Sequence, residues 1–172
     1  KVAAGSKSNA LVEYVDITPT FLAAAELQTP DTMDGHSFLP VLTGENAEHK
    51  NYTFGVQTTR GIGSGSENFG VRSAGTKTHR YVRNLNHSKT FKNVVTRPGG
   101  DKADFWMSWI EKAKSGDAHA LAMTRKYQHR PAEELYDLTT DPNELHNLAA
   151  DPKFAKVLID LRGRLQVKVK QL

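Results

Sequence analysis

The sequence predicts an α+β fold in which a small antiparallel sheet of about four strands packs against a C-terminal helix. Residues 52–57 alternate apolar and polar side chains, and residues 69–74, 78–85 and 135–138 have a similar strand-like composition. After residue 153 the period changes to spacings of three and four, which predicts an amphipathic helix carrying Phe154, Val157, Leu158, Leu161 and Leu165. Several short strands combined with a separate amphipathic helix are typical of an α+β layer.

Two Asp-Pro pairs mark turns in the C-terminal part of the chain. Asp141 and Pro142, with Glu144 at the third helical position, match a capping box and predict a helical turn. The second pair follows ten residues later at 151–152 and predicts that the final helix begins near residue 153.

Two inserted helices and a hairpin are expected between the strands. Gly75 is predicted to occupy a positive-φ position in the turn of the hairpin. Asp101 and Asp117 each precede an apolar pattern and are expected to cap a helix. Trp106 and Trp109 are three residues apart on the first of these helices, and we interpret them as core and rim rather than as a stacking platform.

Residues 1–50, called the leader segment below, are predicted to be separate from a domain formed by residues 51–172. Asp16 is expected to cap a leader helix whose first turn tolerates Pro19. Phe21 and Leu22 contribute to a helix that is apolar around much of its circumference, so it needs partners on more than one side. We expect an isolated chain either to self-associate through this helix or to fold the helix back on its own sheet.

Positive charge is concentrated in one stretch of the chain. The net charge is +4, and residues 68–100 contain no Asp or Glu but do contain Arg72, Lys77, Arg80, Arg83, Lys89, Lys92 and Arg97. One interpretation is a solvated surface that is balanced by acids from other segments. The other is a surface that binds a polyanion such as a sulfated glycan, a phosphorylated ligand or a nucleic acid.

Several classes of site are not indicated by the sequence. The glycine-rich run at residues 61–65 fits neither a dinucleotide fingerprint nor a P-loop, and the histidines lack metal-binding spacing. Glu133 and Glu134 are adjacent on a predicted strand and should point to opposite faces. The chain contains no cysteine and no run of about 18 apolar residues, so we expect neither a cysteine nucleophile nor a membrane span.

Three blocks of residues resemble the sulfatase family in the order that the family shows. Residues 15–22 read VDITPTFL, residues 34–44 read DGHSFLPVLTG, and residues 134–149 read ELYDLTTDPNELHNLA. The segments GVRS at 70–73, RYVRNLN at 80–86 and YQHRP at 127–131 look most like the sulfamidase, or heparan N-sulfatase, branch. The resemblance covers most of the chain.

The resemblance implies an alkaline-phosphatase-like α/β main domain, of which the leader segment would be the end, followed by a small C-terminal domain. It implies hydrolysis of sulfate esters or sulfamates, with N-sulfoglucosamine residues of heparan-type glycans as the expected substrate and a periplasmic or extracellular location. Such enzymes use a formylglycine and a calcium ion. No residue here matches either motif, so the chain alone is expected to be inactive and to carry no cofactor.

The same resemblance suggests which side chains contact the substrate. Arg60 and Glu67 on the glycine-rich loop, together with Arg72 and His79, are predicted to edge the active-site cleft and to bind the sugar or its sulfate. The alternative for Arg72 is a structural ion pair with an acid such as Glu134. A non-catalytic module that binds sulfated glycans is the second functional interpretation. Nucleic-acid binding is not expected, because no recognisable DNA or RNA motif accompanies the basic stretch.

Overall fold

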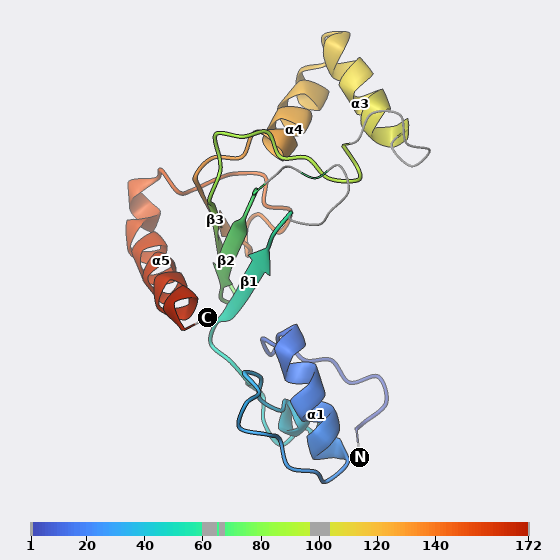
Figure 1. Ribbon diagram of the computed structural model, residues 1–172, viewed down its shortest axis with the longest axis vertical. Coiled ribbons are helices and arrows are strands. Elements are labelled where there is room, and N and C mark those ends of the chain that lie inside the picture. The colour runs from blue at the N-terminus through green and yellow to red at the C-terminus, as the bar shows by residue number, and fades with distance from the viewer. Residues whose placement is uncertain (1, 60–64, 66–67, 97–103, 172) are drawn as a thin grey trace.

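The computed structural model describes residues 2–59, 65, 68–96 and 104–171. Its centre is a four-stranded antiparallel sheet in the order β1-β2-β3-β4, formed by Thr53–Gln57, Val71–Gly75, His79–Asn84 and Glu133–Asp137. The short 3-10 helix η2 (Pro152–Phe154) leads into α5 (Ala155–Lys170), which lies along one face of the sheet (Figure 1). The predicted α+β fold is therefore confirmed.

Two apolar cores lie on opposite faces of the sheet. On one face, Leu158, Leu161 and Leu165 of α5 pack on Ala74, Tyr81 and Leu135, as the helical spacing predicted. On the other face, Val71 and Val82 pack with Phe69 and Phe91, and Tyr127 from α4 closes this cluster. Full burial of one such aliphatic or aromatic side chain contributes about 1.5–3 kcal/mol, so both cores hold the sheet in place.

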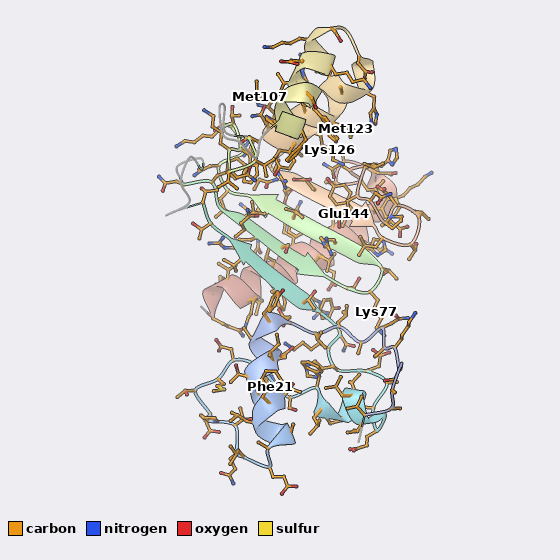
Figure 2. The ribbon with its side chains drawn as sticks, turned by 90° about the vertical axis from the view of Figure 1, so that its right-hand side faces the viewer. Phe21, Lys77, Met107, Met123, Lys126 and Glu144 are labelled. Atoms are coloured by element: carbon orange, nitrogen blue, oxygen red, sulfur yellow. The ribbon has the colours of Figure 1, made fainter. Side chains whose placement is uncertain are left out.

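The insertion between β3 and β4 forms a pair of helices, α3 (Asp104–Lys114) and α4 (Ala118–Gln128). Asp117 caps α4 as predicted, because its Oδ1 accepts a hydrogen bond from Ala120 N at 2.8 Å. Figures 1 and 2 show the α3–α4 pair beyond one end of the sheet and the leader segment beyond the other. Asp101 lies outside the described residues.

The leader segment contains η1 (Tyr14–Asp16), α1 (Ile17–Ala24) and α2 (Leu39–Thr43). The α1 cap predicted at Asp16 is wrong, because the Asp16 backbone is already helical and its side chain accepts no hydrogen bond from an amide of α1. The buried carboxylate instead accepts hydrogen bonds from the Glu13 amide at 2.9 Å and the His36 amide at 3.0 Å. Its Oδ1 also lies 2.8 Å from Lys50 Nζ, so Asp16 ties distant parts of the leader together.

The edges of the sheet are closed by different segments. At β4, Asn147 Oδ1 accepts from Leu135 N at 2.9 Å, and Leu148 N donates to Leu135 O at 2.8 Å. At β1, Glu13 Oε1 accepts from Phe54 N at 2.7 Å. The leader thus contacts the sheet through a polar side chain.

The leader helix is not folded back on the sheet, which was one of two expected arrangements. Phe21 of α1 is 70% exposed and Tyr14 is 92% exposed. Figure 2 shows Phe21 on the leader helix, below the sheet. Self-association and the division of the chain at residue 50 remain predictions.

Two local predictions are wrong. The turn that begins at Asp141 is not a helix, because Glu144 has a φ of 56° and Asp141 Oδ2 accepts from His146 N at 2.7 Å. Glu144 instead pairs with Arg80. Gly75 has no positive φ, because it is the last residue of β2, and the hairpin turn is closed where Thr76 N donates to His79 O at 2.9 Å.

No helix in the described part of the chain is long and apolar enough to cross a bilayer.

Candidate oxyanion-binding site

Arg72 is the second residue of β2, and its side chain is fixed by the backbone. Its Nη1 donates to Gln57 O at 3.1 Å and to Val71 O at 3.0 Å. The alternative pairing of Arg72 with Glu134 is not observed, because Glu134 accepts from Asn84 Nδ2 at 2.6 Å and from the Tyr136 hydroxyl. Arg72 therefore keeps a defined position without a carboxylate partner among the described residues.

Arg72 opens onto a cavity of about 600 Å³ between β2, β3 and α5, called the basic pocket below. Arg72 shares a sheet face with Ala74, which packs against α5, and its register partner on β3 is Arg83. The helix adds Arg162 and Lys170. The residues that line the basic pocket are Arg72, Tyr81, Arg83, Leu85, Arg162, Leu165, Gln166, Val169 and Lys170.

One nearby acid, Glu133, is already neutralised by its neighbours. Arg162 donates to both of its carboxylate oxygens, from Nε at 2.8 Å and from Nη2 at 2.7 Å, and the Tyr81 hydroxyl donates to it as well. Burial alone would raise the pKa of Glu133, but these hydrogen bonds and the charge of Arg162 outweigh burial and hold that pKa below its usual range. Glu133 thus stays ionised and orients Arg162.

The remaining cations of the basic pocket lack such partners. Neither Arg83 nor Lys170 forms an ion pair with any residue that the structure describes, and both are exposed. The positive charges that share this hollow repel one another, and an anionic ligand would relieve this repulsion. Guanidinium groups also present planar pairs of donors to sulfate and carboxylate oxygens.

The wall of the basic pocket is apolar. Leu85, Leu165 and Val169 lie beside the cations, and Gln166 adds an amide that can donate or accept. An anionic group attached to a ring with apolar C–H faces would match both parts of this lining. The arrangement can therefore bind a sulfated or carboxylated sugar.

Sequence reasoning found Arg72 but missed the helical half of the pocket. Arg162, Gln166 and Lys170 follow at intervals of four residues and so lie on one side of α5, next to the apolar stripe. This polar stripe was visible in the sequence as helical periodicity. Because the stripe is far in sequence from the acid-free stretch, the sequence did not show that both line one pocket.

The other predicted contacts do not join Arg72. Arg60 and Glu67 lie outside the described residues. His79 begins β3 at the opposite end of the strand from Arg83, pairs in register with Asp137, and lies with its ring centroid 6.1 Å from that of Phe154. His79 therefore does not line the basic pocket, and any contact that it makes with substrate remains a proposal.

Part of the acid-free stretch is balanced by acids from elsewhere, as one of the two interpretations predicted. Lys77 Nζ lies 2.5 Å from Glu48 Oε1, and Arg80 pairs with Glu144. Arg72 and Arg83, in contrast, form no ion pair with any carboxylate that the structure describes, and both line the basic pocket. The first interpretation thus holds for Lys77 and Arg80, whereas binding of a polyanion remains a proposal.

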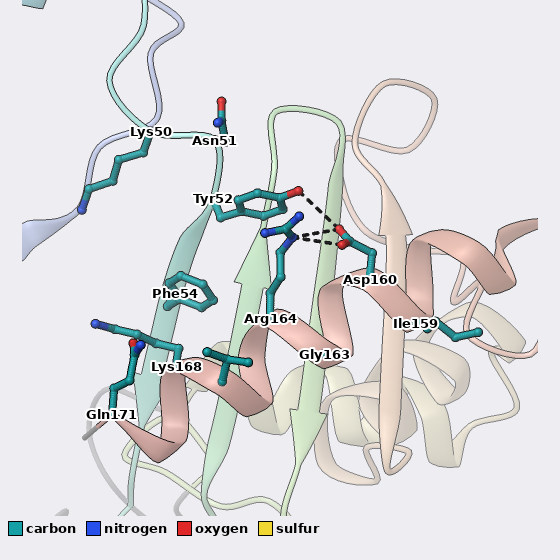
Figure 3. Close-up of a pocket in the computed structure, with 11 residues that line it drawn as sticks. Lys50, Asn51, Tyr52, Phe54, Ile159, Asp160, Gly163, Arg164, Lys168 and Gln171 are labelled. Atoms are coloured by element: carbon teal, nitrogen blue, oxygen red, sulfur yellow. Dashed lines mark hydrogen bonds and ion pairs between the residues drawn. The ribbon is translucent and has the colours of Figure 1, made fainter.

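A second hollow, of about 770 Å³, lies between β1 and α5 (Figure 3). Arg164 covers the ring of Tyr52 at 3.8 Å, and Asp160 accepts from Arg164 Nε at 3.0 Å and from the Tyr52 hydroxyl at 3.4 Å. Because these charges are paired with each other, this groove is a weaker candidate for binding an anion than the basic pocket.

No group of three or more His, Asp or Glu side chains that could hold a metal ion occurs within the described ranges.

Comparison with known proteins places the chain among sulfatases. The family model described as N-sulphoglucosamine sulphohydrolase, C-terminal, matches residues 1–98. An ulvan-active sulfatase of Formosa agariphila is 37% identical over 153 residues, which are 89% of this chain and 28% of that protein. Human N-sulphoglucosamine sulphohydrolase is 29% identical over 182 residues, covering 94% of this chain and 32% of the human protein. The chain thus spans about a third or less of the length of these relatives.

Solved structures agree on the fold. A protein in complex with its substrate D-glucosamine-2-N,6-O-disulfate gives a TM-score of 0.65 at 20% identity and covers 99% of this chain and 26% of its own. A 2-O glycosaminoglycan sulfatase gives a TM-score of 0.57 at 22% identity, covering 91% of this chain and 24% of its own. At these identities the likeness establishes the architecture alone.

Proposed function

The chain belongs to the N-sulphoglucosamine sulphohydrolase C-terminal family, and from this premise we propose that it completes an enzyme that removes sulfate groups from polysaccharides. The match of the family model over residues 1–98 is the observation that carries the proposal. Fold likeness alone would not, since one fold serves many chemistries.

The substrate class follows from what the relatives share. Their names refer to N-sulphoglucosamine, ulvan and Δ4,5-hexuronate 2-O-sulfate, which are different sugars that all carry sulfate. We propose N-sulfoglucosamine residues of heparan-type glycans as the substrate of this enzyme, because the matching family model bears that name. A sulfated algal polysaccharide is the alternative, favoured by the 37% identity to the ulvan-active relative.

The role of this chain would be to bind and orient the anionic sugar. Arg72 is fixed by two backbone carbonyls and so meets an oxyanion without first losing side-chain freedom. Arg83 and Lys170 would raise the local concentration of the polyanion. The formylglycine and the calcium ion expected from the family would be supplied by the remainder of the enzyme, so the 172-residue chain alone should release no sulfate.

The test is a sulfate-release assay with the complete gene product that carries this chain, using heparan sulfate, desulfated heparan and ulvan in parallel. Arg72→Ala should raise KM about tenfold, since a hydrogen bond to a charged group contributes about 1.5–3 kcal/mol, with a smaller effect on kcat. Lys77→Ala, at the other end of the sheet, is the matched control. Unchanged KM and kcat for Arg72→Ala would remove Arg72 from the substrate site, and no sulfate release from any glycan would reject the function.

A non-catalytic module that binds sulfated glycans is the second candidate, because this chain by itself brings Arg72, Arg83 and Lys170 together around one hollow. The discriminating measurement is a titration of this chain with heparin and with single-stranded DNA over a range of salt concentrations. Glycan binding that depends on Arg72, without sulfate release by the complete gene product, would favour the module. A steep salt dependence with no preference for sugar would instead indicate nonspecific polyanion binding.

A further inference from the structure

The outer face of α3 carries two aromatic rings that are exposed to solvent. Phe105 is 56% exposed and Trp109 is 49% exposed, and their spacing of four residues places them on neighbouring turns of one helix face. Lys112 continues the same face at the next turn. We call these three residues the α3 ridge.

The α3 ridge is not needed to hold the helix pair together. The inner face of α3 is anchored by Trp106, which is 5% exposed and lies 5.3 Å from the ring of Tyr127. Figure 2 shows the helix pair beyond the end of the sheet, with Met107 and Met123 labelled on it. Two half-exposed aromatic rings on one face of a helix that Trp106 anchors on another face indicate a binding surface rather than a core.

We propose that the α3 ridge binds a sulfated polysaccharide outside the basic pocket, an inference that rests on the proposed function. Aromatic faces stack on the apolar C–H faces of sugar rings, and one helical turn, about 5.4 Å, separates the two aromatic side chains along the axis. This rise is comparable with the length of one sugar residue. Lys112 would then meet a sulfate on the same chain.

The charge at the end of the ridge supports this ligand. Lys112 Nζ lies 3.4 Å from Asp117 Oδ2, and its side chain is 66% exposed. Such a long and exposed ion pair stabilises the fold little, so Lys112 can exchange Asp117 for a sulfate at small cost. Lys114 lies in the same last turn of α3.

The ridge is a surface separate from the basic pocket. The α3–α4 pair is inserted between Asn84, where β3 ends, and Glu133, where β4 begins. The basic pocket lies on the face of the sheet that α5 covers, whereas Tyr127 of α4 closes the core on the opposite face and Trp106 of α3 packs on Tyr127.

Two other occupants fit less well. A second copy of the chain would need an interface of about 800 Å² on each partner, which two rings and one lysine cannot supply. Stable attachment to a lipid surface needs a broad apolar helix face, whereas Ser108 and Lys112 interrupt this one.

The experiment compares the wild-type chain with Phe105→Ala/Trp109→Ala, using long heparin and ulvan chains as probes in calorimetric titrations. The double variant should bind the long chains about tenfold more weakly, which corresponds to about 1.4 kcal/mol. Leu121→Ala, an exposed apolar residue on α4, is the matched control and should keep the wild-type affinity. Thermal unfolding of each variant checks that the helix pair remains folded.

Trp109→Phe provides the conservative variant. It should retain the affinity for long chains, because an aromatic face remains, but lose the tryptophan fluorescence change that accompanies binding. Equal affinities of the wild-type chain and the double variant would overturn the proposal that the α3 ridge binds glycan. A dimer that depends on the α3 ridge in sedimentation, or binding to phosphatidylcholine vesicles that depends on it, would also overturn the proposal. Failure of the wild-type chain to bind the glycans would also overturn it, while the proposed enzymatic function is judged separately by sulfate release.

Discussion

Asp16 shows how one buried carboxylate can organise a segment that has little core. Burial disfavours its charge, but the ammonium of Lys50 and the amides of His36 and Glu13 outweigh burial and hold the pKa of Asp16 below its usual range. His49 Nε2 lies 3.2 Å from the same carboxylate. The leader segment therefore depends on a cluster of hydrogen bonds and charges rather than on apolar packing alone.

A lowered pKa in the folded state makes the stability of the chain fall in acid. The contribution of Asp16 is complete above the unfolded pKa of about 4 and is lost as pH falls through the depressed folded pKa; Glu133 acts in the same direction. Asp16→Asn should lower the free energy of unfolding by about 2 kcal/mol at pH 7. This is less than the usual loss for a broken buried ion pair, because Lys50 keeps its ion pair with Glu13. The variant should also lose less stability than the wild type between about pH 5 and pH 2. Urea unfolding at several pH values measures both effects. The exposed Asp31→Asn is the control, and an unchanged acid slope in Asp16→Asn would contradict the assignment.

Glu133 stabilises the fold and at the same time restrains the basic pocket. Glu133→Gln should lower the free energy of unfolding by about 1 kcal/mol, because the ion pair with Arg162 is partly exposed. It should also tighten heparin binding, because Arg162 then has no carboxylate to neutralise it. Urea unfolding measures the expected loss of stability, and calorimetric titration of the same sample measures the expected gain in heparin affinity. Weaker binding would show that Glu133 serves only to position Arg162.

At the residue scale, sequence reasoning succeeded where the signal was local. The acid-free stretch contained Arg72 and Arg83, and the alternation of a strand correctly separated Glu133 from Glu134, which contact different partners. It could not supply Arg162 or Lys170, because their approach to Arg72 depends on how α5 crosses the sheet. Partner assignments for buried carboxylates such as Asp16 also depend on tertiary contacts.

Among the elements, two glycines occupy opposite environments. A Cβ on Gly35 would lie 1.9 Å from Val15 O, whereas a Cβ on Gly163, in the middle of α5, would meet no atom within 4 Å. Gly35→Ala should therefore destabilise the leader by about 3 kcal/mol through steric overlap. Gly163→Ala should stabilise the chain by roughly 0.5–1 kcal/mol, because alanine favours the helix. Thermal unfolding measures both, and equal shifts in the same direction would contradict this distinction.

Elements with strong periodicity were predictable, whereas turns were not. All four strands and the final helix came from alternation and helical spacing, because packing on two faces of a sheet imposes these patterns. The capping-box template failed at Glu144 because a sequence match takes no account of tertiary contacts. Glu144 has a left-handed backbone, and its carboxylate pairs with Arg80 of β3. Similarly, the turn after Gly75 is closed partly by the Thr76 hydroxyl, which accepts from His79 N at 3.0 Å.

At the scale of the whole molecule, the exposed apolar surface of the leader requires a partner. Phe21 and Tyr14 are the largest bare side chains there, so the 172-residue chain should self-associate at high concentration unless the rest of the enzyme covers this surface. Phe21→Ser should weaken that association, as measured by sedimentation equilibrium. Val94→Ser, a similarly exposed residue elsewhere, is the control. A wild-type chain that stays monomeric at all concentrations would contradict the prediction.

The architecture as a whole was predictable from the order of the elements, and the family from three motif blocks, but the arrangement of the α3–α4 pair was not. Trp106 is buried and Trp109 is exposed, as predicted for core and rim, whereas sequence reasoning did not favour the sugar stacking that we propose for Trp109. Sequence spacing could not show that the rim residue would join Phe105 on a bare face beyond the end of the sheet. That information lies in the insertion point of the helices between β3 and β4.

The hydrogen bond from Phe54 N to Glu13 closes the otherwise open edge of β1, whereas Asn147 and Leu148 close β4 from within the sheet domain. Detachment of the leader would withdraw Glu13 and leave a strand edge free to pair with another molecule, which is the usual start of β-type aggregation. The leader segment, which would join this chain to the rest of the enzyme, thus also protects the β1 edge from pairing with strands of other molecules. Removing the first 13 residues should shorten the lag time before thioflavin-positive aggregates form.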